Sequence, residues 1–134
     1  MYRWLFRLFA LLAVGCLAGA AYLYEPTQYP TLEVVNLTQD VGELPLNVET
    51  PATVVFRNTG SRPRRILNIN SMCVPSCCWR QEATDAVVVP PYGEASFVVL
   101  LKPTRPGPFT CEPTIYLDDA FLREVSPTFN GIGK

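Results

Sequence analysis

Residues 53–61, which read TVVFRNTGS, join the strongest predicted β-strand of the chain to a turn. The strand portion is rich in β-branched and aromatic side chains, which favour the pleated, half-buried surface of a sheet. The NTGS portion supplies turn residues, among them Gly60, which can take a positive φ. Residues 66–70, ILNIN, follow, and their alternation predicts Leu67 and Ile69 on one face and the two asparagines on the other.

Further short strands are predicted on both sides of this unit, separated by turns that contain proline or glycine. They span residues 32–37, 41–45, 87–89, 95–101, 110–117 and 122–129. The 13 prolines and 8 glycines are spread along the 134 residues, as is typical of a single all-β domain with many short elements. We therefore predict an all-β, immunoglobulin-like two-sheet sandwich over residues 31–134, preceded by one N-terminal hydrophobic helix.

The N-terminal segment, residues 1–24, has the features of an export signal or a transmembrane anchor. Its charges are those of Arg3 and Arg7, and residues 8–24 are uncharged and mostly apolar. An uncleaved single-pass anchor needs about 20 apolar residues, with about 17 as the lower limit, so this run just qualifies. The segment thus predicts a membrane contact through residues 1–24.

Two processed forms compete with the uncleaved anchor. Residues 18–20, AGA, offer a small-residue site for a signal peptidase, and residues 12–16, LAVGC, are similar to a bacterial lipobox in which Cys16 would be lipidated. In the anchored, the cleaved and the lipidated form alike, Arg3 and Arg7 are expected on the cytoplasmic side of the membrane. We therefore expect residues 25–30 to form a short linker and the domain to lie outside the cytoplasm, held at the cell membrane or exported after cleavage.

The composition excludes several classes of function. The chain contains no histidine, which removes Ser-His-Asp and Cys-His nucleophiles and His-based catalytic metal sites. Its net charge is −1, so it lacks the basic surface that nucleic acid requires. No carboxylate pair stands out as a general acid and base. We expect no enzymatic activity, no cofactor and no nucleic-acid partner.

Several polar and aromatic residues have a structural interpretation. Residues 62–65, RPRR, form a small basic turn that would protect the sheet from edge pairing, with docking to lipid headgroups or to an acidic partner as the alternative. Trp79 is expected in the core or under a loop, and Tyr92 is expected to pack against the sandwich edge. Asp118 and Asp119 are expected in a turn.

The order of several motifs resembles a known family. The motifs are residues 40–44 (DVGEL), 54–60 (VVFRNTG) and 67–69 (LNI), the cysteine cluster, residues 90–94 (PPYGE) and residues 130–131 (NG). Together they resemble the bacterial domain-of-unknown-function family 1573, which is similar to the Hydin-type (ASH) immunoglobulin-like domains. That family usually has a compact Cys-Gly-Cys after the strand, where this chain has Cys-Val-Pro-Ser-Cys-Cys. The resemblance implies a fold and an export pattern, and it implies no activity.

Four cysteines lie in the predicted domain, namely Cys73, Cys77, Cys78 and Cys111. Outside the cytoplasm such cysteines form disulfides by default. A bridge between the adjacent Cys77 and Cys78 would close a strained ring, so in a two-bridge protein Cys73 pairs with one of these two and Cys111 with the other. Because the strands before Cys73 and after Cys111 are expected to be antiparallel neighbours, we expect all four sulfurs at one end of one sheet.

Two functions are compatible with this pattern. The first is a non-catalytic, membrane-tethered immunoglobulin-like module outside the cytoplasm, stapled by disulfides, with an unidentified protein partner. The alternative is a thiol-redox or soft-metal protein that uses Cys73, Cys77, Cys78 and Cys111, since thiolates select Cu(I) and Zn. We favour the first, because the cysteine spacing does not match a known metal site.

Overall fold

The computed structural model describes residues 2–23 and 29–134, so residues 25–28 of the predicted linker lie outside the described residues. In this part of the chain one helix precedes twelve strands. The helix α1 spans Tyr2–Leu23. The strands are β1 Leu32–Val34, β2 Thr38–Leu44, β3 Thr50–Asn58, β4 Arg64–Ile69, β5 Met72–Val74, β6 Cys77–Gln81, β7 Val87–Val89, β8 Glu94–Pro103, β9 Gly107–Cys111, β10 Ile115–Leu117, β11 Glu124–Val125 and β12 Thr128–Gly133.

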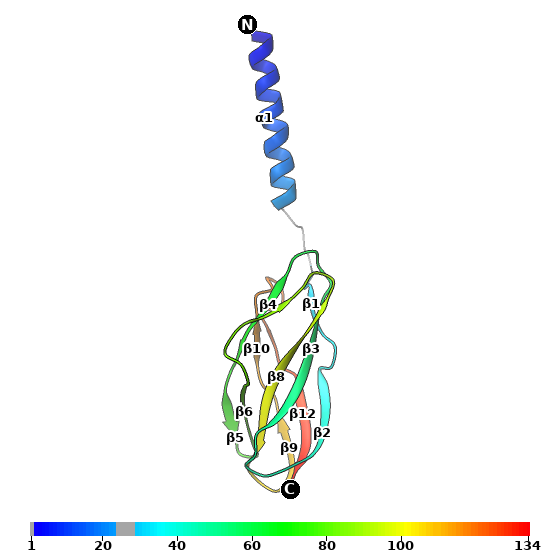
Figure 1. The fold of residues 1–134 in the computed structure, drawn as a ribbon, viewed down its shortest axis with the longest axis vertical. Coiled ribbons are helices and arrows are strands. Elements are labelled where there is room, and N and C mark those ends of the chain that lie inside the picture. Colours follow the sequence, from blue (N-terminus) through cyan, green and yellow to red (C-terminus); the bar gives the residue numbers. More distant parts are fainter. Residues whose placement is uncertain (1, 24–28) are drawn as a thin grey trace.

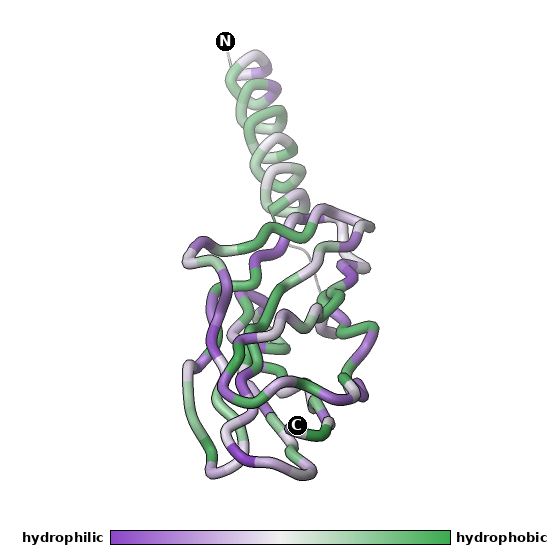
Figure 2. Tube along the Cα trace, turned by 60° about the horizontal axis from the view of Figure 1, so that its bottom comes forward, coloured by the Kyte–Doolittle hydropathy of each residue, from purple (hydrophilic) through white to green (hydrophobic). Residues whose placement is uncertain are grey.

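Helix α1 is long and apolar enough to cross a membrane. Its 22 residues extend about 33 Å at about 1.5 Å per residue, which matches a hydrocarbon core of about 30 Å. None of its residues is buried. Figure 1 shows it standing away from the sheets, and Figure 2 shows apolar residues along most of its length. A signal sequence passes the same test of length and composition.

The β domain is an immunoglobulin-like sandwich, as predicted (Figure 1). Its largest sheet has five strands in the order β1-β3-β8-β6-β5, and two smaller sheets have the orders β11-β10-β4-β7 and β2-β12-β9. Strand β12 runs parallel to β2 and antiparallel to β9. All three sheets contribute side chains to a single hydrophobic core.

The core is built around the pairing of β3 with β8, which extends along nearly the whole of β3. Alternate residues of both strands point inward, and Val54, Phe56, Phe97 and Val99 are at most 1 % exposed. Each buried side chain of this size contributes about 1.5–3 kcal/mol to folding. The β-branched and aromatic pattern that predicts β3 is therefore also the pattern that fills the core.

The turn after β3 is closed by Asn58, which is 1 % exposed. Its Nδ2 donates to the carbonyl oxygens of Arg62 at 2.7 Å and Val89 at 3.3 Å, and its Oδ1 accepts from the backbone N–H of Gly60 at 2.9 Å. One amide thus closes its own turn and ties it to β7. The Asn-Thr-Gly motif has a physical reason here, because the buried carbonyl groups need a donor.

The predicted alternation of β4 was wrong. Leu67 is 37 % exposed, whereas Ile66 and Ile69 are buried. Leu117 of β10 pairs with Ile66, and the register shifts so that Leu67 has no partner. Such a bulge changes which side chains of a strand face the core, and the sequence alternation does not reveal it.

Residues 110–117 do not form the single strand that we predicted. Strand β9 ends at Cys111 in the three-stranded sheet, and β10 begins at Ile115 in the four-stranded sheet. Pro113 lies between them, and proline has no N–H to continue a ladder. The chain passes here from one sheet to another, while Cys111, Ile115 and Leu117 are all buried.

Candidate functional site

The cysteine stretch forms a β-hairpin. Strands β5 and β6 are antiparallel, with Cys73 directly opposite Cys78. The turn between them is tied to the end of β8, because Thr104 donates from its hydroxyl to the carbonyl of Pro75 and from its backbone N–H to that of Ser76, both at 3.0 Å. The Pro-Ser pair between two cysteines was the available signal, since such residues are frequent in hairpin turns.

Strand β6 directs its cysteines to opposite sides of the five-stranded sheet. Cys77 and Trp79 point into the core and are 0 % and 5 % exposed. Cys78 is half-buried and Arg80 is exposed on the outer face. This alternation follows from the two-residue period of a strand, and it separates the adjacent sulfurs of Cys77 and Cys78.

The inner disulfide joins Cys77 to Cys111, 34 residues further along the chain. Both residues are fully buried. Cys77 belongs to the five-stranded sheet and Cys111 to the three-stranded sheet, so the bond crosses the core and links two sheets. The expectation that all four sulfurs gather at one end of one sheet was therefore wrong, because β9 pairs with β12 and not with the strand that precedes Cys73.

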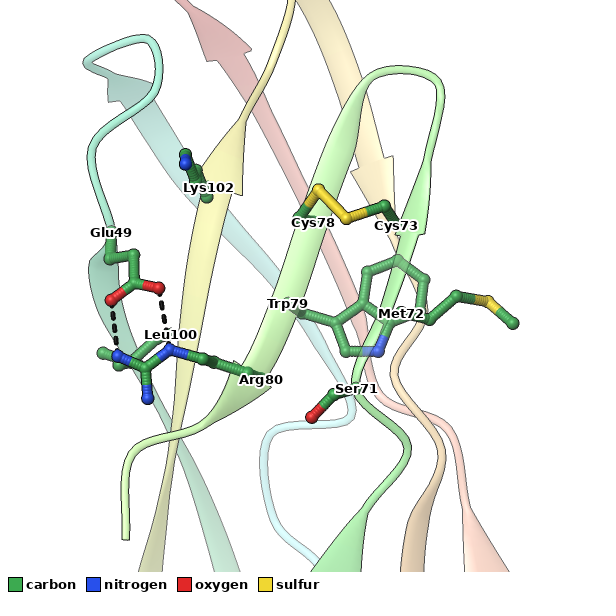
Figure 3. A pocket seen from close by; sticks show the side chains of 9 residues that line it. All are labelled: Glu49, Ser71, Met72, Cys73, Cys78, Trp79, Arg80, Leu100 and Lys102. Atoms are coloured by element: carbon green, nitrogen blue, oxygen red, sulfur yellow. Dashed lines mark hydrogen bonds and ion pairs between the residues drawn. A yellow bond between two sulfur atoms is a disulfide. The ribbon is translucent and has the colours of Figure 1, made fainter.

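The outer disulfide joins Cys73 to Cys78, five residues apart in the sequence. It lies on the outer face of the hairpin, with Cys73 exposed and Cys78 half-buried (Figure 3). The prediction of disulfides in this domain is confirmed, and the structure selects one of the two pairings that the sequence left open. As bonded here, the four sulfurs offer no thiolate to a metal. In the described residues no group of three or more Cys, Asp or Glu side chains is placed to hold a metal ion.

Trp79 fixes the hairpin to the opposite layer. Its Nε1 donates to the backbone carbonyl of Asn70 at 2.7 Å. The side chain Oδ1 of Asn70 in turn accepts from the backbone N–H of Thr114 at 2.7 Å. The indole is buried with its one polar atom paired, as expected for a core tryptophan.

A surface pocket of about 420 Å³ opens beside the outer disulfide. Figure 3 shows its lining residues: Glu49, Ser71, Met72, Cys73, Cys78, Trp79, Arg80, Leu100 and Lys102. Arg80 binds Glu49 with two contacts, Nε to Oε1 at 2.7 Å and Nη2 to Oε2 at 2.6 Å. Hydrogen bonding to Arg80 holds the pKa of Glu49 below its usual range, so this wall of the pocket is an ion pair at neutral pH.

Sequence reasoning missed a second polar cluster, where the chain enters the domain. We call Thr31, Thr59 and Asp119 the entry clamp. Asp119 is 2 % exposed, and its Oδ2 accepts from the Thr31 backbone N–H at 2.8 Å and hydroxyl at 3.1 Å. The Thr31 carbonyl accepts from the backbone N–H of Thr59 at 2.8 Å. Asp119 was predicted as a turn residue. It does stabilise its own turn, since its Oδ1 accepts from the N–H of Phe121 at 2.9 Å, and it also binds Thr31.

The pKa of Asp119 reflects these contacts. Burial alone would raise it, but hydrogen bonds from the backbone N–H groups of Phe121, Thr31 and Leu32 and from the Thr31 hydroxyl outweigh burial and hold the pKa below its usual range. The carboxylate is therefore charged at neutral pH. It is a structural anion, with its oxygens occupied by the groups that it orders.

The remaining residues that the sequence analysis named lie in turns, in strand β4 or on helix α1. Tyr92 does not pack against the sandwich, because it lies in a turn with a φ of 53° and is 74 % exposed. Arg64 donates to the Thr31 hydroxyl at 3.0 Å, and Arg65 contacts Asp118 at 3.5 Å. Cys16 is a free, exposed cysteine on α1.

Comparison with solved structures identifies the kind of sandwich. The ASH/PapD-like domain of human CEP192 (PapD-like domain 7) superposes with a TM-score of 0.60 at 10 % identity, covering 83 % of this chain and 92 % of that one. The fold is that of an ASH/PapD-like immunoglobulin domain. At such identity the likeness concerns the fold alone.

Two bacterial structures share this sandwich. A protein of unknown function from Porphyromonas gingivalis W83 gives a TM-score of 0.55 at 18 % identity, covering 81 % of this chain and 49 % of that one. The VesB protease of Vibrio cholerae gives 0.55 at 8 % identity, covering 84 % of this chain and 34 % of that one. The chain thus spans about half and about a third of these two proteins.

No family model matches the sequence, and no curated protein matches it. The resemblance to the bacterial domain-of-unknown-function family 1573 therefore stays a prediction. The similarity to ASH-type immunoglobulin-like domains is confirmed at the level of the fold.

Proposed function

We propose that this protein is a non-catalytic immunoglobulin-like module, tethered by α1 at the outer face of a membrane, where the domain binds a protein partner. The observation that carries the proposal is the pair of disulfides in a domain that follows an apolar 22-residue helix. Disulfides persist in oxidising compartments and are rare in the cytosol, so the two features support the same location.

The charges of α1 support the orientation. Arg3 and Arg7 lie at the start of the helix, and no acidic residue occurs in its first turn. Basic residues stay on the cytoplasmic side of a membrane helix. This orientation directs the C-terminal end of α1, and with it the β domain, to the outer side.

The end of the sandwich nearest α1 suits a membrane surface. Arg62 of the turn after β3 donates to the carbonyl oxygens of Tyr22 and Leu23, at 3.2 and 3.4 Å, at the end of α1. Phe121 lies at the same end, beside the entry clamp, and is 55 % exposed. Tyr92 is also exposed, at 74 %. Exposed aromatic and basic side chains together are typical of proteins at the headgroup layer.

The entry clamp supports a tethering role. A domain held by its N-terminus transmits any pull through the first residues of its sheet. Here Thr31 is bonded to Asp119 and Thr59, which lie on two different turns, so force from the tether is shared between separate parts of the sandwich.

The outer face of the five-stranded sheet offers a surface for the partner. It presents half-buried apolar residues, Val55, Val98 and Leu100, next to the Glu49–Arg80 ion pair. A mixed apolar and charged surface with aromatic and arginine side chains is typical of a protein-binding site. The end loops of the sandwich provide further contact area.

The mature mass of the chain tests the proposal. Full-length protein, extracted from membranes with detergent and measured before and after reduction with alkylation, should keep residues 1–24 and contain two disulfides. Loss of residues 1–20 would show an exported protein without an anchor, and a lipid on Cys16 would show a lipoprotein. Four free thiols in the domain together with bound zinc or copper would contradict this proposal and would support a soft-metal protein instead.

A further inference from the structure

We propose that the outer disulfide, Cys73–Cys78, is a thiol–disulfide exchange site for a dithiol protein, and that the inner disulfide, Cys77–Cys111, is inert in the folded domain. This goes beyond the proposed function, because it gives one of the two bridges a reaction with a partner of defined chemistry. The partner is a protein with two neighbouring thiols.

The two disulfides differ in their access to solvent. Exchange begins when a thiolate attacks a disulfide sulfur, so the sulfur must be reachable. Cys73 is exposed, and both Cys73 and Cys78 line the surface pocket (Figure 3). Cys77 and Cys111 are 0 % exposed behind the sheet. In the folded domain only the outer disulfide meets the requirement.

The two cysteines of the outer disulfide lie at different depths in the sheet. Strand β5 is at the edge of the five-stranded sheet, and β6 lies between β5 and β8. A partner that approaches the open edge meets Cys73 first. Attack on the Sγ of Cys73 makes the Sγ of Cys78 the leaving group, which is the sulfur that lies further inside the sheet.

A lysine lies opposite the leaving group in the sheet. Lys102 of β8 is directly opposite Cys78 of β6, and both residues line the pocket on the outer face. The Cβ atoms of opposite residues in an antiparallel pair are about 4.5–5.5 Å apart, so the flexible lysine side chain can bring its ammonium to the sulfur. A nearby cation lowers the pKa of a thiol, and a thiol of lower pKa leaves faster.

The exchange takes place in two steps. A thiolate of the partner forms a bond to the Sγ of Cys73, the Cys73–Cys78 bond breaks, and Cys78 leaves as a thiolate paired with Lys102. The second thiol of the partner, once deprotonated, attacks the partner's own sulfur in the mixed disulfide and releases the Cys73 thiolate, which takes up a proton. The partner has become a disulfide and the hairpin a dithiol, with two electrons transferred; the reverse reaction reoxidises the hairpin.

The hairpin has other contacts that hold it in both states. Strand β6 stays paired with β8, Trp79 stays bonded to Asn70, and the inner disulfide keeps Cys77 in the core. Reduction therefore frees the edge strand β5 from its covalent link without unfolding the domain. A redox change at this site alters the edge and the pocket, which belong to the outer face.

Trapping the mixed disulfide tests which sulfur is attacked. The purified, oxidised full-length chain in detergent is mixed with a thioredoxin-type protein whose second active-site cysteine is replaced by serine. Tandem mass spectrometry of the adduct should find the probe on Cys73. An adduct on Cys78, Cys77 or Cys111, or no adduct under native conditions, would overturn the proposal.

Rates test the part played by Lys102. Lys102→Gln should slow adduct formation about threefold, because it removes the cation opposite the Cys78 leaving group, with an unchanged melting temperature. Lys134→Gln removes an exposed lysine that pairs with Glu43 and does not line the pocket, so this matched control should leave the rate unchanged. With dithiothreitol and no denaturant, Cys73 and Cys78 should be reduced at least about 100-fold faster than Cys77 and Cys111.

Equal reduction rates for the two bridges, or equal rates for the two lysine variants, would contradict the proposal. All of these measurements use the purified chain, so their failure leaves the proposed tethered module untouched. Loss of the membrane location would likewise leave the exchange chemistry standing.

Discussion

The carboxylate of Asp119 accepts the backbone N–H of Thr31 at 2.8 Å, across 88 residues of chain. This bond fixes the residue at which the chain enters the domain to the turn after β10. Because Asp119 is buried and its oxygens accept several hydrogen bonds, its removal should affect the whole sandwich and not a single loop.

Asp119→Asn should lower the free energy of unfolding by about 2–3 kcal/mol, since an amide group would replace one of the two accepting oxygens and face buried donors. Urea denaturation followed by tryptophan fluorescence measures the change. The matched control is Asp118→Asn, which keeps an oxygen for the Arg65 backbone N–H and loses only the 3.5 Å ion pair with the exposed Arg65 side chain, at a cost of at most about 1 kcal/mol. Similar losses for the two variants would show that the entry clamp has no special role.

The same carboxylate predicts the response to acid. The pKa of Asp119 is lower in the folded domain than in the unfolded chain, so its contribution to stability is fully present above the unfolded value of about 3.9. That contribution is lost as the pH falls through the folded pKa. Denaturation midpoints measured from pH 6 downwards should therefore decrease less in Asp119→Asn than in the unmodified chain, and parallel curves would exclude this assignment.

The two disulfides should differ in their effect on stability. Replacing both Cys77 and Cys111 with alanine opens a loop of 34 residues, which costs about 4 kcal/mol in the chain-entropy account. Replacing both Cys73 and Cys78 opens a much shorter loop, between residues five apart in the sequence, and costs about 2 kcal/mol by the same account. Guanidinium midpoints of the two double variants check the order, and a larger loss from the outer pair would contradict it.

Gly131 marks a point of close approach between strands. A Cβ at this position would lie 2.6 Å from the ring of Phe109 and 2.8 Å from the carbonyl oxygen of Gly42. Because one of these neighbours is backbone, Gly131→Ala should cost about 1–3 kcal/mol through overpacking. Thermal unfolding should show the loss, while Ile132→Ala, at a residue that is 47 % exposed, should change stability by about 0.5 kcal/mol or less.

The fold could be predicted from local patterns because the same residues that favour strands also fill the core. Val54 and Phe56 show this, since their β-branched and aromatic side chains predict β3 and are fully buried in it. The presence of disulfides followed from the predicted export segment and the four cysteines. The acidic charge balance and the lack of histidine limited the kinds of site to be expected.

The arrangement of the site could not be predicted, because it depends on which strands become neighbours. Cys111 lies in a different sheet from the predicted one, because the chain changes sheets at Pro113, between β9 and β10, where we predicted a continuous strand. Leu67 faces outward because of a register shift that arises only when β4 pairs with β10. The sequence could not show that Asp119, and not its neighbour Asp118, binds the backbone of Thr31, because aspartate is common in turns as well as in buried hydrogen-bonded sites.

The central claim is that the β domain lies outside the membrane to which α1 holds it. The most direct test adds a protease-cleavable epitope after the exposed Lys134 of the full chain and treats bacterial spheroplasts that express it with protease from outside. We predict that the epitope is lost in intact spheroplasts, that the protein stays in the membrane fraction, and that a cytoplasmic control protein survives. An epitope that is lost only after lysis would place the domain in the cytoplasm and contradict the account.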